Sequence, residues 1–306
     1  QNAEMGIALG PDDTVYLGAN DDNVYALDGK SGKELWRFTT SGDVIQVTLS
    51  EDGIVYFGSA GDNKFYALDS KTGKQIAAKT LDLDQRWLTT AIGRGNVLYS
   101  ASNNGVIYEI DRKAGEGKWV LTTGGKYLFN CPTIASDGTI YIGNFEDGTL
   151  YAIQGSSGPA EAGWPMFGQN AQHTGRAGDQ QNAAAAGPPS FTAHVITDTA
   201  PGAHYVHAAD MDNDGDIDAL SASFGDGTAA WYENDGTGKA YKKHELIKGE
   251  GWMKGVHATD MDGDGDMDVL AASESKNSVY LFRNNGGKAF ATEIIDNGTA
   301  MGVRYA

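Results

Sequence analysis

Short apolar runs separated by turn residues recur along the whole chain. In the first half, the run at residues 24–28 (VYALD) returns three times with its tyrosine in place. A second apolar run precedes each copy, and Asp-Gly pairs at 52–53 and 137–138 mark tight hairpins. Apolar and β-branched runs of this length, bounded by Gly, Asn and Asp, predict strands. The tyrosines of the four copies lie 41 to 43 residues apart, at Tyr25, Tyr66, Tyr108 and Tyr151.

A unit of about 40 to 45 residues with several short strands is typical of one blade of a β-propeller. The segments 24–38 (VYALDGKSGKELWRF) and 65–78 (FYALDSKTGKQIAA) resemble the repeat of pyrroloquinoline-quinone-type (PQQ-like) propellers. Gln154 replaces the aspartate in the fourth copy. The resemblance covers residues 1–178 and implies four blades.

A second repeat family follows residues 179–190 (DQQNAAAAGPPS), which lack periodicity and which we interpret as a linker. The run at residues 191–196 recurs at 241–247 and again at 290–295. This unit resembles the FG-GAP/VCBS repeat of integrin-like propellers and of many secreted bacterial proteins. Over residues 191–306 the resemblance implies two complete copies and a third, partial one, so we expect a fragment of a larger protein.

Together the two families predict an all-β protein, a β-propeller of four-stranded antiparallel blades with about six to seven blades. One ring that mixes both families and two interrupted propellers are both compatible with the sequence. Four plus two complete units with partial ends favour the single ring, because an open ring would leave strand edges exposed to pairing with other chains.

Ten aspartates are concentrated in two short runs, 210–218 and 260–268. Crowded carboxylates repel one another unless a cation lies between them. Calcium takes six to eight oxygen ligands, which side chains at positions 1, 3, 5 and 9 and the carbonyl at position 7 of a tight loop supply. We therefore predict two calcium sites. The first uses the side chains of Asp210, Asp212, Asp214 and Asp218 and the carbonyl of Asp216; the second uses the side chains of Asp260, Asp262, Asp264 and Asp268 and the carbonyl of Asp266.

These loops differ from an EF-hand, which needs a bidentate glutamate at position 12. That position holds Ser221 in the first loop and Ala271 in the second, and the residues that follow have the pattern of a buried strand. Each loop is therefore expected to join two strands, as the FG-GAP resemblance also implies. A structural role for calcium is predicted, and magnesium fits less well because it retains several waters.

Composition narrows the choice of partners and location. The 306 residues are 40% hydrophobic and carry a formal charge of −18, which disfavours nucleic acid as a partner. No apolar run approaches the roughly 18 residues of a membrane span. The one cysteine, Cys131, allows no intrachain disulfide and is interpreted as a small buried residue. Whether a signal peptide preceded Gln1 stays open.

Other candidate residues have simpler interpretations. His207 and His257 occupy matched repeat positions, which favours packing over metal binding or catalysis. Trp252 lies in a Gly-rich loop, where it could stack on a sugar ring or pack against the protein. His173 belongs to a segment that resembles the exit peptide of PQQ-like domains. No nucleotide loop, HExxH or GxSxG motif is present, and we predict no catalytic residues.

The sequence therefore favours a calcium-binding module that acts outside the cytoplasm and binds a protein or polysaccharide ligand, for example in adhesion. A secreted, cell-surface or periplasmic location in a bacterium is expected. An accessory or catalytic part of a polysaccharide-active enzyme is the alternative. A PQQ-dependent dehydrogenase fits worse, because the active members of that family have an adjacent cysteine pair and this chain has one cysteine.

Overall fold

The computed structural model describes residues 6–76, 81–82, 89–95, 97–113, 116–123, 128, 131–160, 163–164, 192–286 and 288–297. Within these ranges every regular element is a strand, which confirms the all-β prediction. The same ranges contain no helix that is long and apolar enough to cross a membrane. The expected linker and His173 lie outside the described residues.

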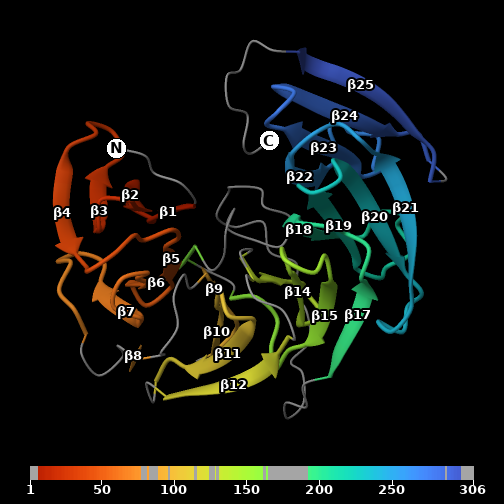
Figure 1. Ribbon diagram of the computed structural model, residues 1–306. Coiled ribbons are helices and arrows are strands. Elements are labelled where there is room, and N and C mark those ends of the chain that lie inside the picture. Colours follow the sequence, from red (N-terminus) through yellow and green to blue (C-terminus); the bar gives the residue numbers. More distant parts are fainter. Residues whose placement is uncertain are drawn as a thin grey trace. The chain divides into compact units, whose positions relative to one another are not determined.

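The strands form six antiparallel sheets, five with four strands and one with five, in the described part of the chain (Figure 1). The chain divides into two compact units. Unit 1 comprises Gln1–Gly138 and Gly155–Phe191, and unit 2 comprises Thr139–Gln154 and Thr192–Ala306.

Unit 1 contains three sheets with strand orders β1-β2-β3-β4, β16-β5-β6-β7-β8 and β12-β11-β10-β9. Consecutive strands are neighbours within each sheet, as hairpin connections require. The strands are β1 (Ile7–Leu9), β2 (Thr14–Gly18), β3 (Asn23–Asp28), β4 (Glu34–Thr39), β5 (Thr48–Ser50), β6 (Ile54–Gly58), β7 (Lys64–Asp69), β8 (Leu81–Asp82), β9 (Thr89–Ile92), β10 (Val97–Ala101), β11 (Val106–Asp111), β12 (Glu116–Thr122), β13 (Thr133–Ile134) and β16 (Gly163–Trp164).

The turn after each PQQ-like strand explains the most regular part of that repeat. The Asp28 carboxylate accepts hydrogen bonds from the Ser31 N–H (2.7 Å) and the Ser31 hydroxyl (2.6 Å). Asp69 repeats both contacts with Thr72 at 2.8 and 2.7 Å. Gly73 follows with a φ of 67°, a conformation that glycine adopts at little cost. The Asp-x-x-Ser/Thr-Gly spacing is therefore a local turn, made by the sequence within each of the first two copies.

Unit 2 contains a sheet with its strands β14, β15 and β17 in that order, and the sheets β18-β19-β20-β21 and β22-β23-β24-β25. Strand β17 pairs antiparallel with β15, although the expected linker separates them in sequence. The strands are β14 (Thr139–Gly143), β15 (Leu150–Gln154), β17 (Ala193–Thr197), β18 (Ala203–Ala209), β19 (Asp218–Ser223), β20 (Thr228–Asn234), β21 (Tyr241–Ile247), β22 (Met253–Thr259), β23 (Asp268–Ser273), β24 (Ser278–Asn284) and β25 (Phe290–Asn297).

The sheets of unit 2 are offset by one strand from the repeats seen in the sequence. The apolar runs that open each FG-GAP-like copy form β17, β21 and β25, and each of these is the outermost strand of the preceding sheet. The run that begins at Phe290 thus completes the last sheet of unit 2. The offset arises because a sequence repeat has no intrinsic start, whereas a hydrogen-bonded sheet has defined edge strands.

The core of unit 2 is filled by alternate residues of its inner strands. Trp231, Phe282 and Leu220 have no exposed surface and belong to one apolar cluster. Trp231 stacks on His244 of β21, with ring centroids 4.2 Å apart. The same cluster includes Ala209 at the end of β18 and Ala258 near the end of β22, and the two acidic loops begin immediately after these strands.

Candidate metal centre

Each acidic loop joins two neighbouring strands of one sheet. The first loop follows β18 and ends where β19 begins, at Asp218. The second follows β22 and ends at Asp268, the first residue of β23. The glycine at position 6 adopts φ 95° in the first loop and 97° in the second, and the residue at position 4 is also left-handed (Asn213, φ 61°; Gly263, φ 80°). The expected strand–loop–strand arrangement is present twice.

Three carboxylates converge in each loop, from positions 1, 3 and 9. One oxygen from each residue lies within 4.8 Å of the others, in the sets Asp210, Asp212, Asp218 and Asp260, Asp262, Asp268. The aspartates at position 5 are placed differently. Asp214 accepts the Asp216 N–H at 2.9 Å, and Asp264 accepts the Asp266 N–H at the same distance. The structure thus brings together three of the four side chains predicted for each site.

Main-chain N–H groups orient the converging carboxylates. Asp218 accepts hydrogen bonds from the N–H groups of Asn234 (2.7 Å) and Met211 (3.0 Å). Its counterpart Asp268 accepts from Asn284 at 2.8 Å and Met261 at 3.0 Å. Asp218 and Asp268 are 1% and 0% exposed. Two separate loops have built the same arrangement, so it follows from the shared sequence pattern.

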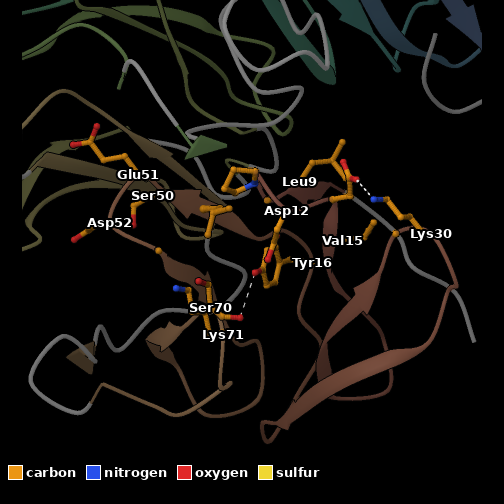
Figure 2. Close-up of a pocket in the computed structure, with 16 residues that line it drawn as sticks. Leu9, Asp12, Val15, Tyr16, Lys30, Ser50, Glu51, Asp52, Ser70 and Lys71 are labelled. Atoms are coloured by element: carbon orange, nitrogen blue, oxygen red, sulfur yellow. Dashed lines mark hydrogen bonds and ion pairs between the residues drawn. The ribbon is translucent and has the colours of Figure 1, made fainter.

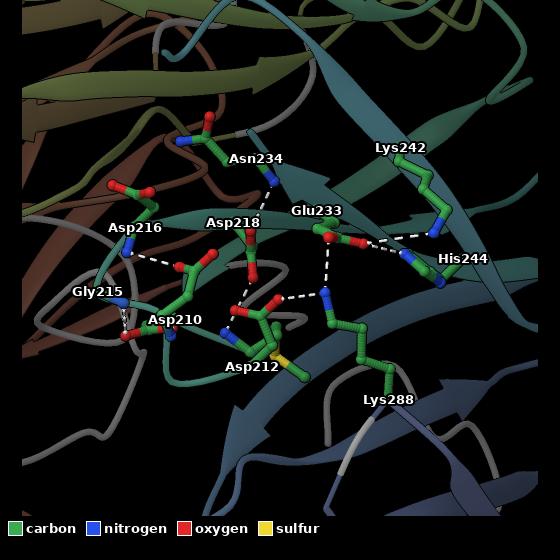
Figure 3. Close-up of polar contacts among 12 residues, drawn as sticks. Asp210, Asp212, Gly215, Asp216, Asp218, Glu233, Asn234, Lys242, His244 and Lys288 are labelled. Atoms are coloured by element: carbon green, nitrogen blue, oxygen red, sulfur yellow. Dashed lines mark hydrogen bonds and ion pairs between the residues drawn. The ribbon is translucent and has the colours of Figure 1, made fainter. Parts of the chain in front are cut away.

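One carboxylate oxygen in the first cluster is buried without a hydrogen-bond partner. The Asp212 side chain is 7% exposed, and its Oδ2 pairs with the Lys288 ammonium at 2.7 Å. Its Oδ1 is buried and accepts no hydrogen bond. A buried polar atom left in this state costs roughly 1–3 kcal/mol, which a cation would recover. Figure 3 shows Asp210, Asp212 and Asp218 close together beside Lys288.

The cluster therefore fits a hard cation. Its donors are carboxylate oxygens, and calcium prefers six to eight such oxygens in a flexible geometry. Softer metals prefer nitrogen or sulfur donors, and neither cluster includes a histidine or a cysteine.

Burial changes the acidity of two members of the first cluster. It raises the pKa of Asp218 to about 7, against the opposing effect of the Asn234 and Met211 N–H groups. It also raises the pKa of Asp210, whose carboxylate accepts the N–H of Gly215. In both cases desolvation penalises the charged form. A bound divalent cation would reverse that penalty by stabilising the carboxylate.

The raised pKa of Asp218 predicts how stability depends on pH. The folded, metal-free protein holds a proton on Asp218 more tightly than the unfolded chain does. The stability contributed by this proton is complete below about pH 4 and is lost as the pH rises to about 7. Calcium needs the carboxylate, so we expect it to raise the melting temperature more at pH 8 than at pH 5. Thermal melts of metal-free and calcium-loaded protein at both values test this, and Asp218→Asn should weaken the pH dependence.

The two loops contact each other. The Asn213 side-chain amide donates to the carbonyl of Gly265 and to the carboxylate of Asp266, both at 3.1 Å. Asn284 donates its N–H to Asp268 and its side-chain amide to the Met211 carbonyl at 3.3 Å. Because the Met211 N–H donates to Asp218, hydrogen bonds link the buried aspartates of the two clusters.

This link predicts cooperative calcium binding. Ordering one loop positions the other, so titration of the wild type should give a Hill coefficient above 1. Asn213→Gly removes the amide yet keeps the left-handed backbone, since glycine already occupies this position in the second loop. We expect this variant to bind two ions with less cooperativity, measured by isothermal titration calorimetry. Equal Hill coefficients for the two proteins would contradict the prediction.

Several residues of the site had no role in the sequence analysis. Lys288 contacts Asp212 and the carboxylate of Glu233, at 2.7 and 2.6 Å. These two carboxylates raise the pKa of Lys288. Arg283 contacts Asp262 at 3.2 Å in the second loop. The two basic residues come from different repeat positions, so no sequence period could reveal them.

The matched histidines pack against each other, and the thiol of the single cysteine is buried. The rings of His207 and His257 pack edge to face, with centroids 4.9 Å apart, on β18 and β22. Burial lowers the pKa of His257 to about 4. Cys131 forms no disulfide. The residue, expected to be buried, is intermediate in exposure, but its thiol is buried, which raises the pKa of the thiol to about 12.

A hollow of about 1190 Å³ in unit 1 is the other candidate for a ligand site (Figure 2). Charged and polar side chains line it, among them Asp12, Lys71 and Tyr16. The Tyr16 hydroxyl donates to the Ser70 carbonyl at 3.3 Å, and burial raises its pKa. All of the residues that line the hollow are described, and none is a histidine or a cysteine. They offer no histidine base for a serine or threonine hydroxyl.

Comparison with family models confirms both resemblances and their order along the chain. Residues 2–78 match the model described as outer membrane protein assembly factor BamB, which represents PQQ-like repeats. Residues 210–271 and 260–306 match the model of the FG-GAP-like repeat. A search of curated proteins finds no match to the chain.

Solved structures with a similar fold are β-propellers. Virginiamycin B lyase from Staphylococcus aureus aligns with a TM-score of 0.63 and 13% identity, over 100% of this chain and 90% of that one. BamB from Moraxella catarrhalis aligns with a TM-score of 0.59 and 14% identity, over 97% of this chain and 76% of that one. At this identity the likeness shows the fold alone. The chain has a β-propeller fold, which an enzyme and an assembly factor share, so the fold does not decide whether the chain is catalytic.

Proposed function

We propose that this protein is a binding module stabilised by calcium, that it acts outside the cytoplasm, and that it has no catalytic role of its own. The buried Asp212 Oδ1, which has no hydrogen-bond partner inside a cluster of three carboxylates, is the observation that carries the proposal. The second loop repeats the cluster with the same main-chain hydrogen bonds.

The position of the loops supports a structural role for the ions. Each cluster takes its carboxylates from both sides of the turn between the first two strands of one sheet. A bound cation would join the end of the first strand to the start of the second. Because the unfolded chain lacks this arrangement, the free energy of calcium binding adds to the stability of the folded protein.

Extracellular calcium at about millimolar concentration suits sites of modest affinity. The periplasm, the cell surface or the external medium of a bacterium is therefore the proposed location. Matches to PQQ-like and FG-GAP-like repeats support it. The ligand is proposed to be a protein or a polysaccharide, and the similarity to an assembly factor is the observation in favour of a protein.

Metal counting tests the proposal. After equilibration with calcium and magnesium together, mass spectrometry should find two calcium ions per wild-type chain. Asp212→Asn and Asp262→Asn should each leave one ion and the double variant none, because each substitution removes a converging carboxylate. Asp216→Asn is the matched control: its residue is expected to act through its carbonyl, so two ions should remain. A wild type without bound metal would contradict the proposal.

A further inference from the structure

An aromatic stack in unit 2 ends in a half-exposed tryptophan. Trp252 stacks on Phe224, with ring centroids 5.1 Å apart and an interplanar angle of 21°. Phe224 in turn lies 5.7 Å from the ring of Phe145. Trp252 nevertheless leaves 50% of its surface exposed. Since Phe224 stacks on one face of the indole, the exposed surface of the ring lies on its other face and its edges.

The backbone holds Trp252 in this position from both sides. Its N–H donates to the Ser275 hydroxyl at 2.9 Å, and its carbonyl accepts the N–H of Glu274 at 3.0 Å. Gly251, directly before it, has a φ of 77°. Single exposed apolar residues are common on protein surfaces and need no explanation. A large ring fixed by two main-chain bonds and a stacking partner is different, because it can bind a ligand without losing side-chain freedom.

Three charged side chains near the stack already have partners. Lys254 places its ammonium 5.6 Å from the Phe224 ring centroid and pairs with Glu274 at 2.5 Å. Glu250 accepts a hydrogen bond from the Tyr280 hydroxyl at 2.8 Å. These paired groups offer little attraction to a charged ligand. The formal charge of −18 further opposes an anionic one.

We propose that the open face of Trp252 binds a neutral polysaccharide. A sugar ring presents a face of C–H groups, which carry slight positive charge and pack on the electron-rich face of an indole. Its hydroxyl groups lie at the ring edge, where they keep their hydrogen bonds to water and to polar groups of the loop. An uncharged, hydroxyl-rich chain thus matches an open aromatic face among paired charges. The inference rests on the proposed binding function and specifies its ligand.

Affinity electrophoresis tests this with the 306-residue chain after equilibration with calcium. The gels contain laminarin, xyloglucan, galactomannan or dextran as probes. At least one should slow the wild type, and Trp252→Ala should weaken that binding about tenfold or more. Trp252→Phe keeps an aromatic face and should lose only about two- to threefold. Val195→Ala removes another exposed apolar side chain of unit 2 (55% exposed) and should bind as the wild type does.

Unchanged mobility of the wild type with all four probes would overturn the inference, as would equal retardation of wild type and Trp252→Ala. A protein partner that requires Trp252, with no retardation in any gel, would also overturn it. Melting curves should show that Trp252→Ala remains folded. Calcium is counted in the same samples. If the protein binds two calcium ions but no gel retards it, only the polysaccharide proposal is rejected. If a gel retards the wild type more than Trp252→Ala but no calcium is bound, only the calcium sites are rejected.

Discussion

Removal of calcium is expected to lower the melting temperature of this protein by about 10 to 20 °C. A ligand present at about 100 times its Kd stabilises the folded state by about 2.7 kcal/mol, so two equivalent sites contribute about 5 kcal/mol. In domains of roughly 150 to 250 residues, 1 kcal/mol changes the melting temperature by about 2–4 °C. Thermal melts in about 1 mM calcium and in excess chelator measure the difference directly.

Magnesium provides the control for this experiment. It favours a strict octahedral geometry and retains water, so at equal concentration it should restore only a small part of the lost melting temperature. The double variant Asp212→Asn, Asp262→Asn should melt at one temperature in all three buffers. Identical melts of the wild type with calcium and with chelator would reject a structural role for the two clusters.

The strands and both acidic loops could be predicted from the sequence because their causes are local. The Asp28–Ser31 turn uses hydrogen bonds between residues three apart, and the second copy repeats it at Asp69 and Thr72. The left-handed conformation at Gly215 likewise follows from the residue type inside a short loop. Period, turn chemistry and residue spacing therefore carry enough information for the fold class and for where the loops lie.

Strand pairings and ion pairs between residues far apart in the sequence could not be predicted. Nothing local to β17 shows that it pairs with β15 across the expected linker. Asp214 is an exception to this rule: its contact with the Asp216 N–H is local, but the spacing alone fits a calcium ligand equally well. Lys288, which pairs with Asp212, lies 76 positions after it in the sequence. The role of Asn284, by contrast, has a signal in the sequence. Asn234 and Asn284 recur 50 residues apart, and both donate main-chain N–H groups to the buried aspartates.

Replacement of Trp231 by alanine should be the most damaging single change in the core of unit 2. The side chain has no exposed surface and lies in the cluster that contains Phe282. It stacks on His244 and meets the edge of Phe290, at centroid distances of 4.2 and 6.1 Å. Loss of a buried tryptophan costs about 3–5 kcal/mol because the neighbours close the cavity only in part. The unfolding midpoint in urea should fall accordingly.

Trp252→Ala is the matched control, since the same residue type is removed from a site that is 50% exposed. Its unfolding free energy should change by less than about 1 kcal/mol. Trp231→Phe keeps a ring between His244 and Phe290 and should lose less than the alanine variant. Equal midpoints for Trp231→Ala and Trp252→Ala would mean that Trp231 is not part of the packed core. We expect Trp231→Ala to be the least stable variant, Trp231→Phe intermediate and Trp252→Ala the most stable. This order would show that Trp231 packs in the core, whereas Trp252 contributes little to stability and is available to a ligand.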